Sequence, residues 1–313
     1  MDLRLEHRVG PTSTRQFNYV LLDVFTQTRL EGNPLAVFPT AAGISDVEMQ
    51  RIAGELNLSE TVFLFEPTTS DAAAKARIFT PRRELAFAGH PTVGSAYVIN
   101  RRKAQSFPFF IEENVGLIRI DADTDDADNP VLWLTTPSIV FFETVDPSFC
   151  ARLLGLARED IQSGCLPQFV SAGSPLLFIC LNTPQDVDRA EIQNDLLGEA
   201  LGSVDSVGTF IFARKQPQSA SCFDVYSRMF APQTGIPEDP ATGGATGPLA
   251  AYMLSCGALP PKDRLQFTSE QGAKMGRRSL LHVRVAAKGG DMSIQVGGSA
   301  VITAEGVFLL DAH

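Results

Sequence analysis

An internal repeat is the feature of this sequence that most constrains its fold. The first copy reads Arg77-Ile78-Phe79-Thr80-Pro81, then Glu84, then Gly89-His90-Pro91-Thr92. The second copy reads Arg228-Met229-Phe230-Ala231-Pro232, then Glu238-Asp239, then Gly243-Gly244. Upstream of the two copies lies a further matched pair, Gly32-Asn33-Pro34-Leu35 and Gly173-Ser174-Pro175-Leu176. Because duplicated halves usually place matching turns face to face, the repeat predicts two similar lobes with a site between them.

The length and charge of the chain set the next bounds. A chain of 313 residues is long enough for two domains, each with its own core. We expect an N-terminal lobe over 17–128 and a C-terminal lobe over 129–298, with a final strand, 299–313, that could return to the first lobe. A net charge of −10 argues against a nucleic-acid partner. No apolar stretch is long enough to span a membrane and the N-terminus does not resemble a secretory signal, so we expect a cytoplasmic protein.

The cysteines and histidines argue against a metal centre. The five cysteines are an odd number without C-x-x-C spacing, which favours a reducing compartment and buried, inert thiols. The four histidines lack the spacings that are typical of zinc ligands. We therefore expect no metal and no cofactor.

Strand-like segments outnumber helical ones. Residues 45–57 open with the capping-box pair Ser45 and Glu48 and are expected to be helical. Further helices are expected from Pro91 to Arg102, from Pro147 to Leu156, from Asp186 to Gly202, and from the second glycine turn to Ser255. Residues 1–16 are expected to form a loose leader and Asp121–Pro130 an exposed linker. Few helices are long enough to serve as crossovers, so the pattern favours an α+β fold with mixed or antiparallel sheets and one main helix per half.

The two glycine turns are candidate binding elements. Glycine permits close approach of the backbone, and the first N–H groups of a helix have no partner within it. The turns at Gly89 and at Gly243-Gly244 therefore suit a carboxylate or phosphate. His90 could donate to a substrate oxygen or could be a helix cap, and Asp239 could face the cleft or simply form a turn.

Glu60 is the candidate acid–base residue. It lies where a predicted helix ends and the apolar segment Thr61-Val62-Phe63 begins. A partly buried carboxyl at that point would have a raised pKa, which suits proton transfer. The alternative is a solvated glutamate on a loop.

Several blocks of the chain, in order, resemble the PhzF family. They are Asp23-Val24-Phe25, Glu31-Gly32-Asn33-Pro34, Asn57-Leu58-Ser59-Glu60-Thr61, Gly89-His90-Pro91-Thr92, Glu238-Asp239-Pro240-Ala241-Thr242-Gly243, and the terminal Val296-Gly297-Gly298 with Ala304-Glu305-Gly306. The resemblance covers nearly the whole chain from Phe17 onward. It implies phenazine-biosynthesis-type isomerases with the diaminopimelate epimerase fold, in which two pseudo-symmetric lobes each wrap a sheet around a central helix.

The resemblance also implies roles for individual residues. Glu60 would be the general acid and base that moves a proton between substrate carbons. His90 and Asp239 would contact a small carboxylate substrate, and the turns at Gly89, Gly243 and Gly244 would hold its anionic group. It further suggests a homodimer.

Two departures limit what the resemblance implies about the substrate. Related epimerases and proline racemases carry a cysteine in each glycine turn, whereas this chain has Gly89 and Gly244 there, so a two-thiol mechanism is ruled out. The family commonly has serine where this chain has Gly244, so the phenazine precursor is not assumed to be the substrate. The alternative interpretation is a binding or scaffolding protein that keeps the fold without turnover.

Overall fold

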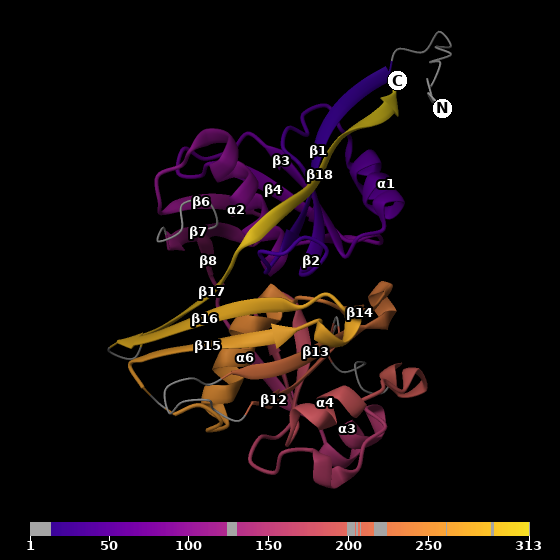
Figure 1. Ribbon diagram of the computed structural model, residues 1–313, viewed down its shortest axis with the longest axis vertical. Coiled ribbons are helices and arrows are strands. Elements are labelled where there is room, and N and C mark those ends of the chain that lie inside the picture. The colour runs from indigo at the N-terminus through magenta and orange to yellow at the C-terminus, as the bar shows by residue number, and fades with distance from the viewer. Residues whose placement is uncertain are drawn as a thin grey trace.

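The computed structural model describes residues 14–123, 130–198, 204, 206, 208–215, 224–260, 262–288 and 291–312. Within these residues, eighteen strands form one hydrogen-bonded network around a small number of helices. Two lobes lie one above the other, and each wraps strands around a central helix (Figure 1). The expected α+β arrangement of two lobes is confirmed.

The elements follow a similar order in both lobes, and the second lobe has the additional helix α3. The first lobe contains β1 (Thr14–Val24), β2 (Asn33–Phe38), α1 (Asp46–Leu56), β3 (Glu60–Phe65), β4 (Ala74–Phe79), β5 (Glu84–Leu85), α2 (Gly89–Lys103), β6 (Phe109–Glu113) and β7 (Gly116–Asp123), and β8 (Val131–Thr135) leads out of it. The second contains β9 (Val140–Thr144), α3 (Pro147–Leu153), β10 (Gln168–Ser171), β11 (Pro175–Cys180), α4 (Pro184–Arg189), β12 (Gly208–Arg214), β13 (Val225–Ala231), β14 (Ile236–Asp239), α6 (Gly243–Ser255), β15 (Arg264–Gln271), β16 (Ser279–Lys288) and β17 (Asp291–Gly298). The last strand is β18 (Ala300–Asp311).

The strand pairings show that the repeat in the sequence is a repeat in three dimensions. In the first lobe β2 and β3 are parallel, β3 and β4 antiparallel, and β4 and β6 parallel. In the second lobe β11 and β12, β12 and β13, and β13 and β15 pair in the same three senses. The helices α2 and α6 therefore occupy equivalent places, and the two lobes are pseudo-symmetric.

The matched arginines and glutamates of the repeat support equivalent turns. Arg77 donates to both carboxylate oxygens of Glu84, at 2.8 and 2.7 Å, and lies over the ring of Phe79. Arg228 likewise donates to both oxygens of Glu238, at 2.9 and 2.8 Å, and lies over the ring of Phe230. A bidentate pair of this kind fixes orientation as well as distance. Each pair therefore holds the hairpin that precedes a central helix.

The central helices are buried on nearly all sides. In α2 every residue from Gly89 to Ile99 is buried, and in α6 every residue from Ala245 to Met253 is buried. A helix that is apolar all round belongs inside a sheet rather than on its surface. By contrast α1 is amphipathic, carries the capping box predicted at Ser45 and Glu48, and lies on the outside of its lobe (Figure 1).

The chain crosses between the lobes twice. β8 pairs with β7 of the first lobe and with β17 of the second, so the two sheets are continuous. After β17 the chain returns along the first lobe as β18, which runs antiparallel to β1 over its whole length (Figure 1). Three residues expected in a loose leader, 14–16, belong to β1, because pairing with β18 orders them. Similarly Asp121–Asp123 belong to β7, while residues 124–129 of the expected linker lie outside the described residues.

The helix expected from Asp186 to Gly202 is wrong. Instead of one continuous helix, the described residues have the short helix α4, a 3-10 turn at Asn194–Leu196 and helical residues at 197–198. Ala190 is extended, and the next residues pair with the end of α3, since Glu191 N donates to Leu154 O and Gln193 N donates to Leu153 O. Tertiary pairing of the backbone therefore overrides a local helical pattern. Residues 199–202 lie outside the described residues.

The expectation of unpaired thiols is wrong for two of the five cysteines. Cys165 and Cys256, 91 residues apart, form a disulfide that ties the end of α6 to the loop before β10. A count of cysteines does not show a pairing that only the fold brings together. Cys150 and Cys180 are free and buried, and burial raises the pKa of each thiol to about 12, so they are inert as expected. Cys222 lies outside the described residues.

No described helix is both long and apolar enough to cross a bilayer.

Candidate active site

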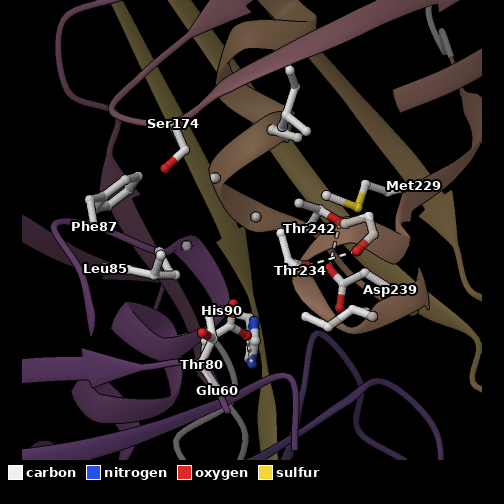
Figure 2. A pocket seen from close by; sticks show the side chains of 18 of the residues that line it. Glu60, Thr80, Leu85, Phe87, His90, Ser174, Met229, Thr234, Asp239 and Thr242 are labelled. Carbon is white, nitrogen blue, oxygen red and sulfur yellow. Dashed lines mark hydrogen bonds and ion pairs between the residues drawn. The ribbon is translucent and has the colours of Figure 1, made fainter. Parts of the chain in front are cut away.

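A pocket lies between the lobes, where the N-termini of α2 and α6 meet. Figure 2 shows Glu60 and His90 on one side of it and Asp239, Thr242 and Met229 on the other. The lining residues come from both copies of the repeat. They are Glu60, Thr80, Arg83, Leu85, Phe87, Ala88, Gly89, His90, Ala172, Ser174, Leu176, Met229, Ala231, Thr234, Ile236, Asp239, Thr242, Gly243, Gly244 and Ala245.

The two helix N-termini are in contact because glycine stands at the crossing. A β-carbon on Gly89 would lie 2.3 Å from the carbonyl carbon of Gly243 and from the nitrogen of Gly244. One on Gly243 would lie 2.8 Å from the ring of Phe25. Side chains at these two positions would push the lobes apart, so glycine is needed there for a steric reason.

The positive ends of these two helices are not compensated by side chains of the helices themselves. Neither α2 nor α6 has an acidic residue in its first turn or a side-chain cap. In contrast α1 has the Ser45 cap together with Asp46 and Glu48. The first N–H groups of a helix lack partners within it, and its macrodipole attracts negative charge. The pocket floor therefore has the character of an anion-binding site.

Glu60 lies at the beginning of β3, beside Leu35 of β2, with its side chain only 13% exposed. Its Oε2 is buried and accepts no hydrogen bond from the described residues. Burial, and then the negative charge of Asp239, raises the pKa of Glu60 well above the ordinary value of 4.5. The sequence-based expectation of a partly buried carboxyl with a raised pKa agrees with this environment.

His90 is a neutral imidazole rather than an ion-pair partner. Its side chain is 3% exposed, and burial lowers its pKa to about 3. The amide nitrogen of Asn33 is 3.3 Å from His90 Nδ1, and because an amide nitrogen only donates, Nδ1 accepts. The ring proton is then on Nε2, which lies 3.4 Å from Glu60 Oε2. His90 therefore presents a donor to the space that Glu60 occupies.

Asp239 is buried but well supplied with donors. Its Oδ1 accepts from Asn33 Nδ2 at 2.8 Å and from Ser59 Oγ at 3.2 Å, and its Oδ2 accepts from Thr242 Oγ1 at 2.6 Å. Burial raises the pKa of Asp239 to about 6, and these hydrogen bonds act in the opposite direction. The contacts of Asn33 and Ser59 cross from the first lobe to the second. The polar cluster is thus part of the lobe interface.

The pocket has polar groups on one side of the pseudo-symmetry axis and apolar groups on the other. Met229 faces Asp239 across β13 and β14, and Ile78 faces Leu85 across β4 and β5, so Leu85 occupies the place equivalent to Asp239. Leu35 faces Glu60 and Leu176 faces Gly208, so Gly208 is equivalent to Glu60. A β-carbon on Gly208 would lie 2.3 Å from Phe230 O. Only one of the two equivalent places can therefore hold an acid–base side chain.

The structure brings the six sequence-predicted site residues, Glu60, Gly89, His90, Asp239, Gly243 and Gly244, around one pocket. Sequence reasoning assigned no role to Asn33, Ser59 or Arg83. Asn33 belongs to the matched pair Gly32-Asn33 and Gly173-Ser174. Because Ser174 stands where the first half has Asn33, the sequence did carry a signal that the two halves differ in function. Ser174, at the equivalent place, directs its hydroxyl toward the pocket (Figure 2).

Comparisons with known proteins agree with this fold. Residues 22–306 match the family model PhzC-PhzF, described as phenazine biosynthesis-like protein. An uncharacterized isomerase of Mesorhizobium japonicum is 36% identical over 92% of this chain and 97% of its own length. A trans-2,3-dihydro-3-hydroxyanthranilate isomerase of Pseudomonas chlororaphis is 30% identical over 94% of this chain and 99% of its own length.

Solved structures share the fold. The crystal structure of a phenazine biosynthesis protein of the PhzF family from Bacillus anthracis aligns with a TM-score of 0.84 at 22% identity, covering 95% of this chain and 100% of the other. A hydroxyproline epimerase from Agrobacterium vitis aligns with a TM-score of 0.63 at 12% identity, covering 95% of this chain and 92% of its own. The expected epimerase-like architecture is confirmed.

Proposed function

The chain belongs to the PhzC-PhzF family and is an isomerase. We propose that it moves a proton between two carbons of a small carboxylate-bearing substrate, with Glu60 as the only acid–base group. One observation carries this proposal. Glu60 Oε2 is a buried carboxyl oxygen that accepts no hydrogen bond from the described residues, and Glu60 lines the pocket where the N-termini of α2 and α6 meet.

The proton transfer has two steps. In the first, the ionised Glu60 removes a proton from a carbon next to a carboxylate or conjugated system, and the electron pair moves into that system. In the second, the protonated Glu60 returns the proton to another carbon, and the double bonds shift accordingly. A carboxyl with a raised pKa suits both steps, because it is a stronger base when ionised and remains an acid near neutral pH.

The other groups bind rather than transfer protons. We propose that the substrate carboxylate lies at the N-termini of α2 and α6, where Gly89, Gly243 and Gly244 begin the two helices. Neutral His90 and ionised Asp239 would then hold polar groups of the substrate. Developing negative charge in the transition state would be stabilised by the same N–H groups.

A single acid–base group favours a shift along one face of the substrate over inversion at one carbon. Inversion needs groups on opposite faces, and Gly208 stands at the place equivalent to Glu60. Gly89 and Gly244 likewise offer no thiol. We therefore propose isomerisation by proton shift, not racemisation, for this chain.

The test is exchange in heavy water with a panel of small aromatic and amino-acid carboxylates. The wild-type protein should incorporate deuterium into a substrate, and Glu60→Gln, which keeps the shape but cannot exchange protons, should lose at least a thousandfold in rate, within the range for acid–base groups. Glu66→Gln, just beyond the other end of β3, is the matched control and should exchange at the wild-type rate. Full exchange by Glu60→Gln would contradict the proposal.

A further inference from the structure

Arg83 lies in the tight turn between β4 and β5, on the side of the pocket formed by the first lobe. The turn is fixed by its own hydrogen bonds, since Arg83 N donates to Thr80 Oγ1 at 3.0 Å and Thr80 N donates to Arg83 O at 2.8 Å. The side chain is exposed and lines the pocket. The backbone of Arg83 is thus fixed by hydrogen bonds within the turn, and its guanidinium extends from that backbone beside the pocket.

The neighbouring arginines have partners, whereas Arg83 has none among the described residues. Arg77 forms the bidentate pair with Glu84, and Arg82 Nη1 donates to Gln233 O of the other lobe at 3.1 Å. No carboxylate or carbonyl oxygen of the described residues accepts from the Arg83 guanidinium. In a chain with a net charge of −10, a guanidinium without an acidic partner beside a pocket is available to an anionic ligand.

The wall between Arg83 and the buried acid–base group is mostly apolar. It is formed by Leu85, Phe87, Leu176, Met229 and Ile236 (Figure 2 labels Leu85, Phe87 and Met229). The side chains of Glu60 and His90 are 13% and 3% exposed, while Arg83 is exposed, so the polar groups of this pocket differ in depth. An occupant that matches it has a polar inner end, an apolar body and an anionic outer end.

We propose that the substrate carries a second anionic group, bound by Arg83 at the pocket opening, so that this isomerase favours a dianionic over a monoanionic substrate. The inference rests on the proposed function in one respect, because it takes the first carboxylate to lie at the N-termini of α2 and α6. Arg83 is then a specificity-determining residue. The planar guanidinium suits a carboxylate or a phosphate, which it can bind through two parallel hydrogen bonds.

The test compares two ring carboxylates that differ in one charge. Isophthalate has two carboxylates on an apolar ring, and its monomethyl ester has one. We expect calorimetry at low salt to show that the wild-type protein binds isophthalate about tenfold more tightly than the ester. A difference of that size is expected from one partly exposed hydrogen-bonded pair between a guanidinium and a carboxylate. Arg83→Gln should lose this preference, and Arg83→Lys, which keeps the charge, should retain part of it.

Arg82→Gln is the matched control, since it removes the adjacent cation, whose Nη1 already donates to Gln233, and should keep the preference. A wild-type protein that binds both compounds equally, or an Arg83→Gln variant that still prefers isophthalate, overturns the inference. Glu60→Gln should also keep the preference, because binding at Arg83 needs no proton transfer. Failure of the inference and failure of the proposed function are therefore seen in different variants and different assays.

Discussion

At the scale of single residues, the hydrogen bonds that each buried carboxyl accepts influence its pKa and thus its protonation state in the pocket. Asp239 accepts from three donors and has a pKa of about 6, whereas Glu60 Oε2 accepts no hydrogen bond from the described residues and Glu60 has a pKa well above its ordinary value. Burial raises both pKa values, and hydrogen bonds oppose that rise at Asp239, which acts toward a separation of the two carboxyls in proton affinity. Such separation is how a site obtains one ionised group and one exchangeable group at the same pH.

Asn33 should hold the Asp239 pKa down. Its Nδ2 donates to Asp239 Oδ1 at 2.8 Å, and a donor to the ionised form favours that form. We expect Asn33→Ala to raise the Asp239 pKa above about 6, because burial remains while a donor is lost. Carbon-13 NMR titration of the carboxyl measures this directly. An unchanged or lower pKa in Asn33→Ala would show that Asn33 does not tune this group.

Glu113 should make stability depend on pH. This buried residue accepts from Thr92 Oγ1 at 2.6 Å beneath the first turn of α2, and burial raises its pKa to about 8. The folded-state pKa lies above the unfolded value of 4.5, so the contribution of the protonated group to stability is complete below pH 4.5 and is lost as pH rises through 8. Glu113→Gln stays neutral and should remove that loss, which is of the order of 1.4 kcal/mol per pKa unit.

Urea unfolding of both proteins between pH 4 and pH 9 measures the difference, which should be small at the acid end and largest above pH 8. The adjacent Glu112 is the matched control. Hydrogen bonds from Thr68 lower its pKa, so Glu112→Gln should not reproduce the effect. Parallel pH curves for wild type and Glu113→Gln would contradict the assignment.

At the scale of elements, the contact of α2 with α6 makes Gly89 less tolerant of a side chain than Gly244. A β-carbon at Gly89 meets backbone at 2.3 Å, whereas one at Gly244 has its nearest neighbour, Gly89 N, at an ordinary 3.5 Å. We expect Gly89→Ala to lower the free energy of unfolding by about 1–3 kcal/mol, as overpacking does, and to displace the anion site. Gly244→Ala should stay within about 0.5 kcal/mol of wild type. Chemical denaturation of the two variants tests this, and equal losses would contradict it.

The elements also show what could be predicted from the sequence. The two central helices were predictable, because a glycine turn followed by an apolar run is a strong local signal, and it occurs twice. The capping box at Ser45 and Glu48 was equally local. The helix expected from Asp186 to Gly202 failed because Glu191 and Gln193 pair with the end of α3, a contact that local pattern does not contain.

The candidate site shows the same division. That Glu60, His90 and Asp239 lie at one pocket was predictable from the repeat and from motifs of adjacent residues. Asn33 was not, since its partner Asp239 is 206 residues away and only the fold brings them together. Arg83 was not, because a surface arginine has no distinguishing pattern in a sequence.

At the scale of the whole molecule, the disulfide between Cys165 and Cys256 joins the end of α6 to the loop before β10. It closes a loop with a sequence separation of 91, so it should restrict the unfolded chain strongly. We expect Cys256→Ser to lower the free energy of unfolding by about 2–4 kcal/mol in oxidised protein and by much less in the presence of a reductant. Thiol counting under denaturing conditions is the control, and equal stability of the two proteins without reductant would contradict the prediction.

The site lies between the two lobes, and neither lobe alone supplies all the residues that line it. The first lobe supplies Glu60, Asn33 and His90, and the second supplies Asp239. The two similar halves therefore form one pocket with unlike sides, in which Glu60, His90 and Asp239 have no side chains of the same kind at the equivalent positions.

The most direct test follows the transferred proton during a single turnover. The substrate is one found by the exchange screen, and it is deuterated at the carbon that loses the proton. If Glu60 carries the proton between carbons within the buried pocket, wild-type product in ordinary water should retain part of the deuterium at the new position, the rest being lost by the solvent exchange that the screen detects, and Glu60→Gln should form no product. Product formed by Glu60→Gln at the wild-type rate would contradict the account.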